Sequence, residues 1–232
     1  MHRFVAAVAL AALALAVTTT ASAQDGFTLR IAPRIGHLTP ADWFYDEFPH
    51  FGVGDTEWTE AAILPSTLAG VTAELRLEGV GLWVRGDVLR TIGGETSLVH
   101  AVLVPPGGYN PPYVARSPYR LETGITFASL ELVFPTRLRL PLGIQPYVAA
   151  GVGGKRYDFD TAPLADLAGR LVLPSDGTTL SANVAAGFTL DLSGFVLDLL
   201  VRDAISEYWG DTQHDVMVLA GVSLRLFRRG DP

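Results

Sequence analysis

The feature that most constrains the fold of this chain is an apolar residue at every second position in several segments. From Leu180 to Leu190, these positions hold leucine, alanine, valine or phenylalanine, and small or polar residues lie between them. The segments 27–36, 71–77 and 216–226 show the same period of two on one face. Successive side chains of a β-strand point to opposite faces of the sheet. The pattern therefore predicts an all-β fold whose strands each have one continuous apolar face.

Eight candidate strands can be placed in the chain, although the fifth is too rich in glycine and alanine for its faces to be assigned. We predict strands over residues 27–36, 68–77, 80–90, 120–133, 145–158, 179–191, 195–206 and 214–227. The fourth is irregular, because Leu121 to Phe127 are apolar at odd positions and Leu130 to Phe134 at even ones. A β-bulge near Ala128–Ser129 would bring both sets to one face, and we expect one there.

The links between these strands alternate in length. The long links are 37–67, 91–119 and 159–178, and the shorter ones between them are 78–79, 134–144 and 192–194. The last link, 207–213, is intermediate. An antiparallel up-and-down barrel with an even number of strands places its long loops on one rim and both termini on the other. Outer-membrane barrels have this arrangement, with long extracellular loops and short periplasmic turns. We therefore predict an eight-stranded antiparallel transmembrane β-barrel.

The N-terminus predicts export from the cytoplasm. Phe4 to Val17 form an apolar run of 14 residues, followed by the small residues Ala21-Ser22-Ala23. A membrane-spanning helix needs about 20 apolar residues, so the run is shorter than an anchor and suits a signal peptide. An uncleaved N-terminal anchor is the alternative. We expect a cleaved signal peptide over 1–23 and an outer-membrane β-barrel domain over 24–232.

Composition excludes several other classes. The chain has no cysteine, so neither a disulfide nor a lipid-bearing N-terminal cysteine is expected. Removing residues 1–23 leaves 16 basic and 24 acidic residues, a balance that argues against a nucleic-acid partner. Hydrophobic residues reach 49%, yet the longest uncharged stretch after residue 24, 96–115, contains four prolines and cannot form one helix.

A soluble antiparallel barrel or sandwich, apolar inside and polar outside, is the main alternative fold. Three features favour the membrane barrel: aromatic residues near the short turns, nearly balanced charges on the polar faces, and only one lysine, Lys155. The expected aromatic girdle consists of Phe27, Phe134, Tyr147, Phe188, Phe195 and Phe227.

Charges on the polar faces are expected to meet inside the barrel. Its lumen is only wide enough for side chains, and an unpaired buried charge is costly, so we predict an ion-pair network. The predicted members are Arg30, Arg34, Glu74, Arg76, Arg85, Asp87, Glu122, Asp191, Asp198, Arg202 and Arg225. Within it we expect Arg202 to pair with Asp198 or Glu122.

Two segments resemble a known family. Gln145–Gly154 resembles the "PYVGAGVG" strand of small outer-membrane barrels of the OmpA transmembrane-domain and OmpW-like kind. Gly221, Leu224 and Leu226 are similar to the C-terminal signal read by the barrel-assembly machinery, although Leu219 occupies the position where that signal is polar, and five residues follow Phe227. The resemblance implies a Gram-negative-type outer membrane as location. It also implies outer-membrane lipid, the assembly machinery and periplasmic chaperones as partners.

The narrow lumen favours a non-enzymatic barrel that contributes to envelope structure or presents its long loops for surface interaction. The segment 37–67 is the best candidate for contact with a surface ligand, because aromatic residues lie among acids there. These aromatics are Trp43, Phe44, Tyr45, Phe48, Phe51 and Trp58. They could equally cap the barrel or lie at the lipid interface. An OmpW-like narrow conduit for small solutes is an alternative function.

A surface hydrolase is a second alternative, using His214 beside Asp211 and Asp215. No set of nucleophile, base and orienting group is visible, so no catalytic residue is predicted. Gly151–Lys155 lacks the first glycine and the final Ser or Thr of a phosphate-binding loop. No cofactor and no metal is predicted either, because the only candidate ligands have no standard spacing. These candidates are His37, Asp42, Asp46 and His50.

Overall fold

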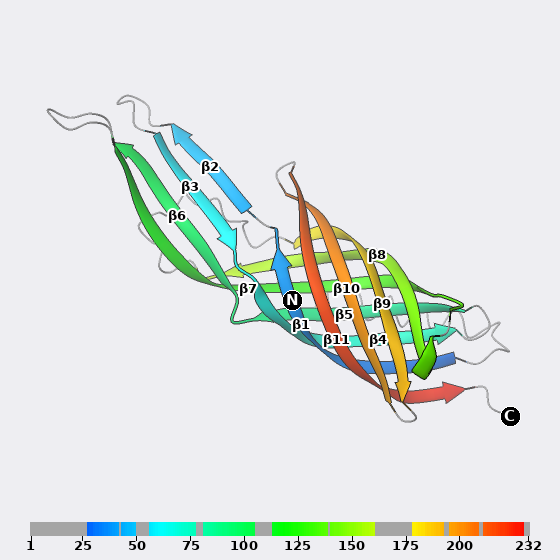
Figure 1. Ribbon diagram of the computed structural model, residues 1–232. Helices are drawn as coiled ribbons and strands as arrows, with labels where there is room; N and C mark the ends of the chain where they lie inside the picture. Colours follow the sequence, from blue (N-terminus) through cyan, green and yellow to red (C-terminus); the bar gives the residue numbers. More distant parts are fainter. Residues whose placement is uncertain are drawn as a thin grey trace.

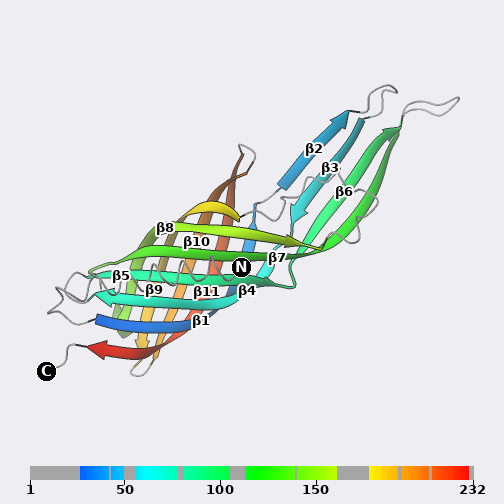
Figure 2. The same cartoon turned by 180° about the vertical axis from the view of Figure 1, so that it is seen from behind.

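A computed structural model of the chain shows a closed antiparallel β-barrel (Figures 1 and 2). It describes residues 27–41, 43–49, 56–77, 81–104, 113–138, 140–160, 178–192, 195–208 and 211–229. The barrel strands are β1 (Phe27–Pro40), β4 (Ser66–Leu77), β5 (Leu82–Ile92), β7 (Tyr113–Pro135), β8 (Ile144–Phe159), β9 (Thr178–Leu192), β10 (Phe195–Tyr208) and β11 (Asp211–Arg229). Each pairs with the next in this order, and β11 pairs with β1 to close the ring. The predicted eight-stranded antiparallel barrel is confirmed.

Three further strands lie where the sequence predicted loops. The first long link contains β2 (Trp43–Pro49) and β3 (Thr56–Ile63), and the second contains β6 (Glu95–Val104). β7 also begins at Tyr113 instead of residue 120, and β6 pairs with this added length. The four strands form a sheet in the order β2–β3–β6–β7, which projects away from the barrel (Figure 1). We call residues 43–49, 56–63, 95–104 and 113–122 the projecting sheet.

The strands are strongly tilted. Hydrogen-bonded neighbours of Ile35 lead through β4, β5 and β7 to Arg156 on β8, whereas the opposite route through β11, β10 and β9 leads to Pro146. The two end points differ by ten residues, from 146 to 156. With about 3.3 Å per residue and about 4.8 Å between strands, this stagger gives a tilt of about 40°. Such a tilt is typical of small membrane barrels.

The predicted bulge in β7 is wrong. The pairing of β7 with β5 and with β8 runs without interruption through Ala128 and Ser129. Leu121 and Phe127 point into the molecule and are buried, whereas Leu132 and Phe134 point outward and are 43% and 47% exposed. The change of parity therefore reflects a change of surroundings. In its lower half the strand has lipid outside and a charged lumen inside, and in its upper half it has water outside and an apolar core inside.

The other strands confirm which face meets lipid. Their outward side chains near the middle of the barrel are apolar and exposed, whereas the inward ones are polar, small or charged. The exposed set includes Ile35, Val71, Val152, Val184, Val201 and Val218. Phe134, Phe188 and Phe195 are also exposed, near the rim of the short turns. Tyr147, which the sequence assigned to this girdle, instead points inward and is 2% exposed.

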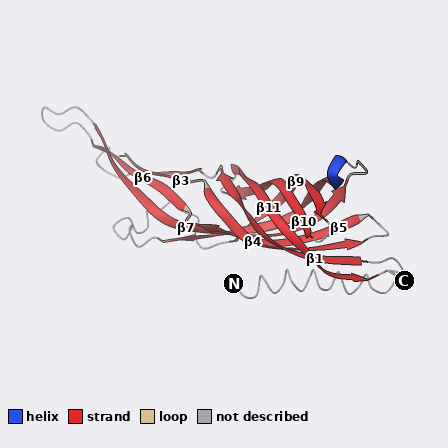
Figure 3. Ribbon diagram, turned by 60° about the horizontal axis from the view of Figure 1, so that its bottom comes forward, coloured by secondary structure: helices blue, strands red, loops and turns tan. Residues whose placement is uncertain are grey.

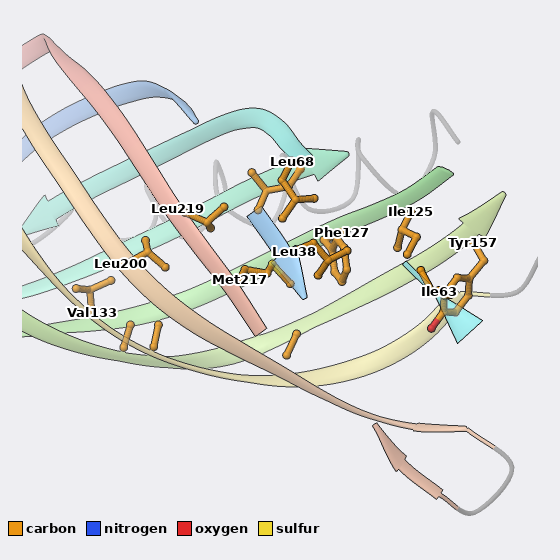
Figure 4. Packing of buried hydrophobic residues seen from close by; sticks show 14 of the residues in the cluster. Leu38, Ile63, Leu68, Ile125, Phe127, Val133, Tyr157, Leu200, Met217 and Leu219 are labelled. Atoms are coloured by element: carbon orange, nitrogen blue, oxygen red, sulfur yellow. The ribbon is translucent and has the colours of Figure 1, made fainter. Parts of the chain in front are cut away.

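An apolar layer fills the upper part of the barrel. Leu38, Leu68, Phe127 and Met217 come from four strands and lie together in Figure 4. None of their side chains is more than 3% exposed. At the opposite rim, the only helix among the described residues is a single turn, η1 (Pro141–Gly143), between β7 and β8 (Figure 3). In the described part of the chain, no helix has the length and apolar character needed to cross a membrane.

Candidate functional site

Small residues on one wall of the lumen make room for large charged ones. The inward positions of β8 and β9 include Ala149, Gly151 and Ala185. A Cβ atom added at Gly151 would lie 2.1 Å from the carbonyl oxygen of Leu130, so only glycine fits against β7 at this position. The glycine- and alanine-rich sequence of β8 thus leaves the width of the lumen to the long side chains of β1, β5 and β10.

The lower half of the lumen contains a group of ion pairs centred on Asp198. Asp198 pairs with Arg34 and, at 3.1 Å, with the Nη2 atom of Arg85. The hydroxyl of Tyr147 donates a hydrogen bond of 2.6 Å to Asp198 Oδ1. Arg85 Nη2 also lies 3.1 Å from Glu74 Oε2, and these side chains are buried. Five strands, β1, β4, β5, β8 and β10, are therefore joined through one buried arginine and one buried carboxylate.

A second group lies directly above it and is centred on Arg202. Its guanidinium pairs with Asp87, and its Nε atom lies 2.8 Å from Glu131 Oε1 as an ion-pair contact. Asp87 Oδ1 also accepts a hydrogen bond of 3.0 Å from Ser129. Glu131 Oε2 lies 4.0 Å from Arg85 Nη1, which links the two groups.

Each carboxylate described in this network faces at least one arginine. Lower in the lumen, Arg76 Nε donates a hydrogen bond of 2.6 Å to Glu74, and its guanidinium lies 3.5 Å from the centre of the Trp83 ring. Four arginines and four carboxylates then take part: Arg34, Arg76, Arg85, Arg202, Glu74, Asp87, Glu131 and Asp198. Burying charges is costly, and an arginine beside every one of these carboxylates offsets that cost.

The predicted partners of Arg202 are wrong. Asp198 is engaged by Arg34 and Arg85, and Glu122 is exposed on the outer face of β7. The bulge assumed at Ala128–Ser129 placed Glu122 in the lumen. Glu131 has lumen parity with or without the bulge, because Leu130 and Leu132 on either side of it belong to the outer face, and the sequence prediction omitted it.

Three predicted network residues remain, and only Arg30 is seen inside the lumen. Arg30 points inward near the lower end of β1 and is 6% exposed. It also takes part in interactions there. Asp191 has lumen parity but is exposed at the end of β9. The side chain of Arg225 lies outside the described residues.

A separate buried ion pair, which the sequence did not predict, lies within the apolar layer. Lys155 Nζ lies 2.8 Å from Asp215 Oδ2 and 3.2 Å from Gln213 Oε1. Both charged side chains are fully buried, and the Tyr157 ring centre lies 5.1 Å from Nζ. This pair joins β8 to β11 across the upper lumen.

Side chains fill the lumen at both levels. A cavity at its lower end, lined by Arg30, Arg34, Glu74 and Asp198 among others, measures about 10 Å³. That space holds about one water molecule. Above it come the buried ion pairs and then the apolar layer. The described lumen is therefore packed like a protein core.

The segment expected to bind a surface ligand forms part of the projecting sheet. Residues 37–67 contain the end of β1, β2, β3 and the start of β4. On β3, Thr59 and Ala61 are buried, and Trp58 donates a hydrogen bond of 3.0 Å to Glu60. The side chains of the other predicted aromatics lie outside the described residues.

The residues of the hydrolase alternative can be placed only in part. His214 is on the outer face of β11, where its Nδ1 atom lies 2.7 Å from Asp203 Oδ2 on β10. Asp215 points inward to Lys155, and the side chain of Asp211 is not described. No group of three or more potential metal ligands occurs among the described residues. Of the four metal candidates, His37 is exposed on β1, and the side chains of Asp42, Asp46 and His50 lie outside the described residues.

Two further motifs can be placed in part. Gly221 points inward, and a Cβ atom there would lie 2.9 Å from Arg34 Cδ, so the glycine leaves room for this arginine. The side chains of Leu224 and Leu226 lie outside the described residues. Gly151–Lys155 is part of β8, as expected for a strand.

These observations define the class of protein. Closure of the barrel pairs its backbone groups and its interior holds the ion pairs, so both conditions for crossing a membrane are met, and the exposed apolar belt on its outer surface is stable when lipid covers it. The chain is therefore a small outer-membrane β-barrel.

Comparison with solved structures finds similar chains at low sequence identity. OprG from Pseudomonas aeruginosa is 14% identical, with a TM-score of 0.49 over 89% of this chain and 97% of OprG. Neisserial surface protein A is 12% identical, with a TM-score of 0.48 over 86% of this chain and 97% of that one. No protein-family model matches the chain, and no curated protein matches it in sequence. Identity this low concerns the fold alone.

Proposed function

We propose that this outer-membrane protein is a closed, non-enzymatic barrel that works through its projecting sheet, by interaction with other molecules at the cell surface. The observation that carries the proposal is the filled lumen, where Arg85, Arg202, Asp87 and Glu131 are each at most 3% exposed. A filled lumen leaves no path for a solute. The strands that extend beyond the membrane are therefore the part of the protein best suited to contact other molecules.

The projecting sheet is built as a platform. It adds three strands to the extended end of β7, and among the described residues β2 pairs only with β3, so one edge is open. On the β7 side, residues 114–118 are exposed. Arg120 and Glu95 form an exposed ion pair of 3.3 Å on neighbouring strands. The sheet lies on the rim opposite the termini, which is the extracellular rim in barrels of this build.

The two alternatives lack comparable support. A conduit for small solutes would have to open both the ion pairs and the apolar layer. A hydrolase would need a nucleophile beside His214, whose side-chain partner among the described residues is Asp203.

Export and assembly complete the proposal. Residues 1–23 would be removed as a signal peptide, and Gly221, Leu224 and Leu226 would be read by the barrel-assembly machinery after delivery by periplasmic chaperones. A role in envelope structure is compatible with this reading, because the buried network makes a rigid membrane element.

The test compares the wild-type protein with a variant in which 42–64 and 95–122 are each replaced by a short Gly-Asn turn. Both should fold as barrels whose gel mobility changes on heating. Cells carrying the wild-type protein should adhere to one another and to protein-coated surfaces more strongly than cells carrying the variant. Wild-type protein in planar bilayers should give no discrete conductance steps. Equal adhesion of both strains, or steady wild-type conductance, would refute the proposal.

A further inference from the structure

The turn between β7 and β8 exposes leucines on a hydrogen-bonded backbone. Leu138, Leu140 and Leu142 are 59%, 40% and 83% exposed, and Leu142 is the most exposed large hydrophobic side chain among the described residues. The turn is held by hydrogen bonds from the Thr136 amide to Pro146 O at 2.9 Å and from the Leu140 amide to Ile144 O at 3.0 Å. A fixed backbone therefore presents the three leucines.

The conformation of Leu142 makes this exposure more informative. Its φ of 65° and ψ of 14° lie in the left-handed region, which favours glycine and asparagine and disfavours leucine. Among the described residues it is the only one other than glycine with a positive φ. A turn that merely faced water would be more stable with asparagine or glycine here. An exposed leucine in a strained conformation points to a contact outside the chain.

The position of the turn identifies that contact. It follows Phe134, which is exposed to lipid, and lies beside the end of β9, on the rim where β1 begins and β11 ends (Figure 3). This is the periplasmic rim, at the lower margin of the apolar belt. The exposed Arg137 lies next to Leu138. Apolar side chains beside a cationic one suit the boundary between acyl chains and phosphate groups.

We propose that residues 136–138 and 140–143 form a phospholipid-binding anchor in the inner leaflet of the outer membrane. Leu138, Leu140 and Leu142 enter the acyl region, and Arg137 pairs with the phosphate of an anionic phospholipid. The anchor fixes the height of the barrel in the membrane at one point of its periplasmic rim.

Cysteine chemistry offers a direct test, because the chain has no cysteine of its own. The full mature barrel is folded into vesicles of phosphatidylethanolamine and phosphatidylglycerol, with an environment-sensitive fluorophore on Leu142→Cys. Glu207→Cys, exposed near the opposite rim, is the matched control. Lipids brominated in their acyl chains should quench the label at position 142 at least about twofold more than the label at 207. Equal quenching at the two positions would overturn the anchor, including the case in which a periplasmic protein is the true contact.

A second comparison tests the headgroup. Arg137→Gln is combined with the Leu142→Cys label, and phosphatidylglycerol is varied against phosphatidylcholine. With Arg137 present, quenching should rise with the anionic fraction, whereas in the Arg137→Gln variant it should not. The same dependence in both proteins would overturn the role of Arg137. Heat-dependent gel mobility confirms that every labelled protein is folded. Asparagine tolerates the left-handed backbone conformation at position 142, so the Leu142→Asn variant should fold normally. Because it lacks one apolar side chain of the anchor, it should insert into vesicles several-fold more slowly than wild type.

Discussion

Replacing Arg202 by methionine is the sharpest test of the lumen network. The change removes the partner of Asp87 and one of two partners of Glu131, while methionine keeps much of the volume. At about 3 Å and an effective dielectric constant of about 20, each ion pair is worth about 5 kcal/mol before the desolvation of Arg202 is subtracted. Removing one member of a buried group costs about 3–5 kcal/mol, because it leaves charge uncompensated. We expect Arg202→Met to lower the free energy of unfolding by that amount.

The assay is urea unfolding of the barrel folded into vesicles, followed by tryptophan fluorescence and by gel mobility. Arg90→Met is the matched control, because the Arg90–Asp158 pair has side chains that are 52% and 69% exposed. An exposed pair contributes about 1 kcal/mol or less. Adding Asp87→Leu to Arg202→Met should recover part of the loss, whereas adding Asp198→Leu should not, because it leaves Asp87 uncompensated and also removes the carboxylate that pairs with Arg34 and Arg85. If Arg202→Met were no more costly than Arg90→Met, the buried network and the orientation of the strands would both be refuted.

Three further predictions concern the membrane face, the buried lysine and export. Val184→Arg should cost about 2–4 kcal/mol and impair insertion, because Val184 is 49% exposed on the apolar belt. The control Val184→Ala should insert normally. Equal insertion of the two variants would show that Val184 does not face lipid. Lys155, the only lysine in the chain, is 1% exposed. Amine-reactive reagents should therefore modify it only after unfolding, and mass spectrometry showing rapid labelling of the folded barrel would exclude the buried pair with Asp215. N-terminal sequencing of the envelope form should begin at Gln24, and recovery of Met1 would disprove cleavage.

The sequence alone determined the number of barrel strands and, in the membrane-spanning part, which face of a strand with period-two alternation meets lipid. Period-two alternation is a local property, since neighbouring side chains on a strand must point to opposite faces. The rhythm of long and short links then determined which rim carries the termini. The lumen position of Arg34, Arg85, Asp87 and Arg202 followed from parity alone.

Partner choice inside the lumen was decided by the tertiary structure. Which arginine meets which carboxylate depends on the stagger of ten residues around the ring, which no single strand encodes. Arg202 therefore reaches Asp87 and Glu131, although Asp198 lies on its own strand. Lys155 and Asp215 came together for the same reason.

The projecting sheet was likewise decided by tertiary pairing. β2, β3 and β6 lie in segments that the sequence assigned to loops, and they become strands because β7 continues beyond the barrel and offers its edge to β6. The reversal of parity in β7 has the same origin. The surroundings of its outer face change from lipid to water where the strand leaves the membrane. Beyond that point the apolar residues lie on the inner face. The sequence pattern shows the change of parity but does not show its cause.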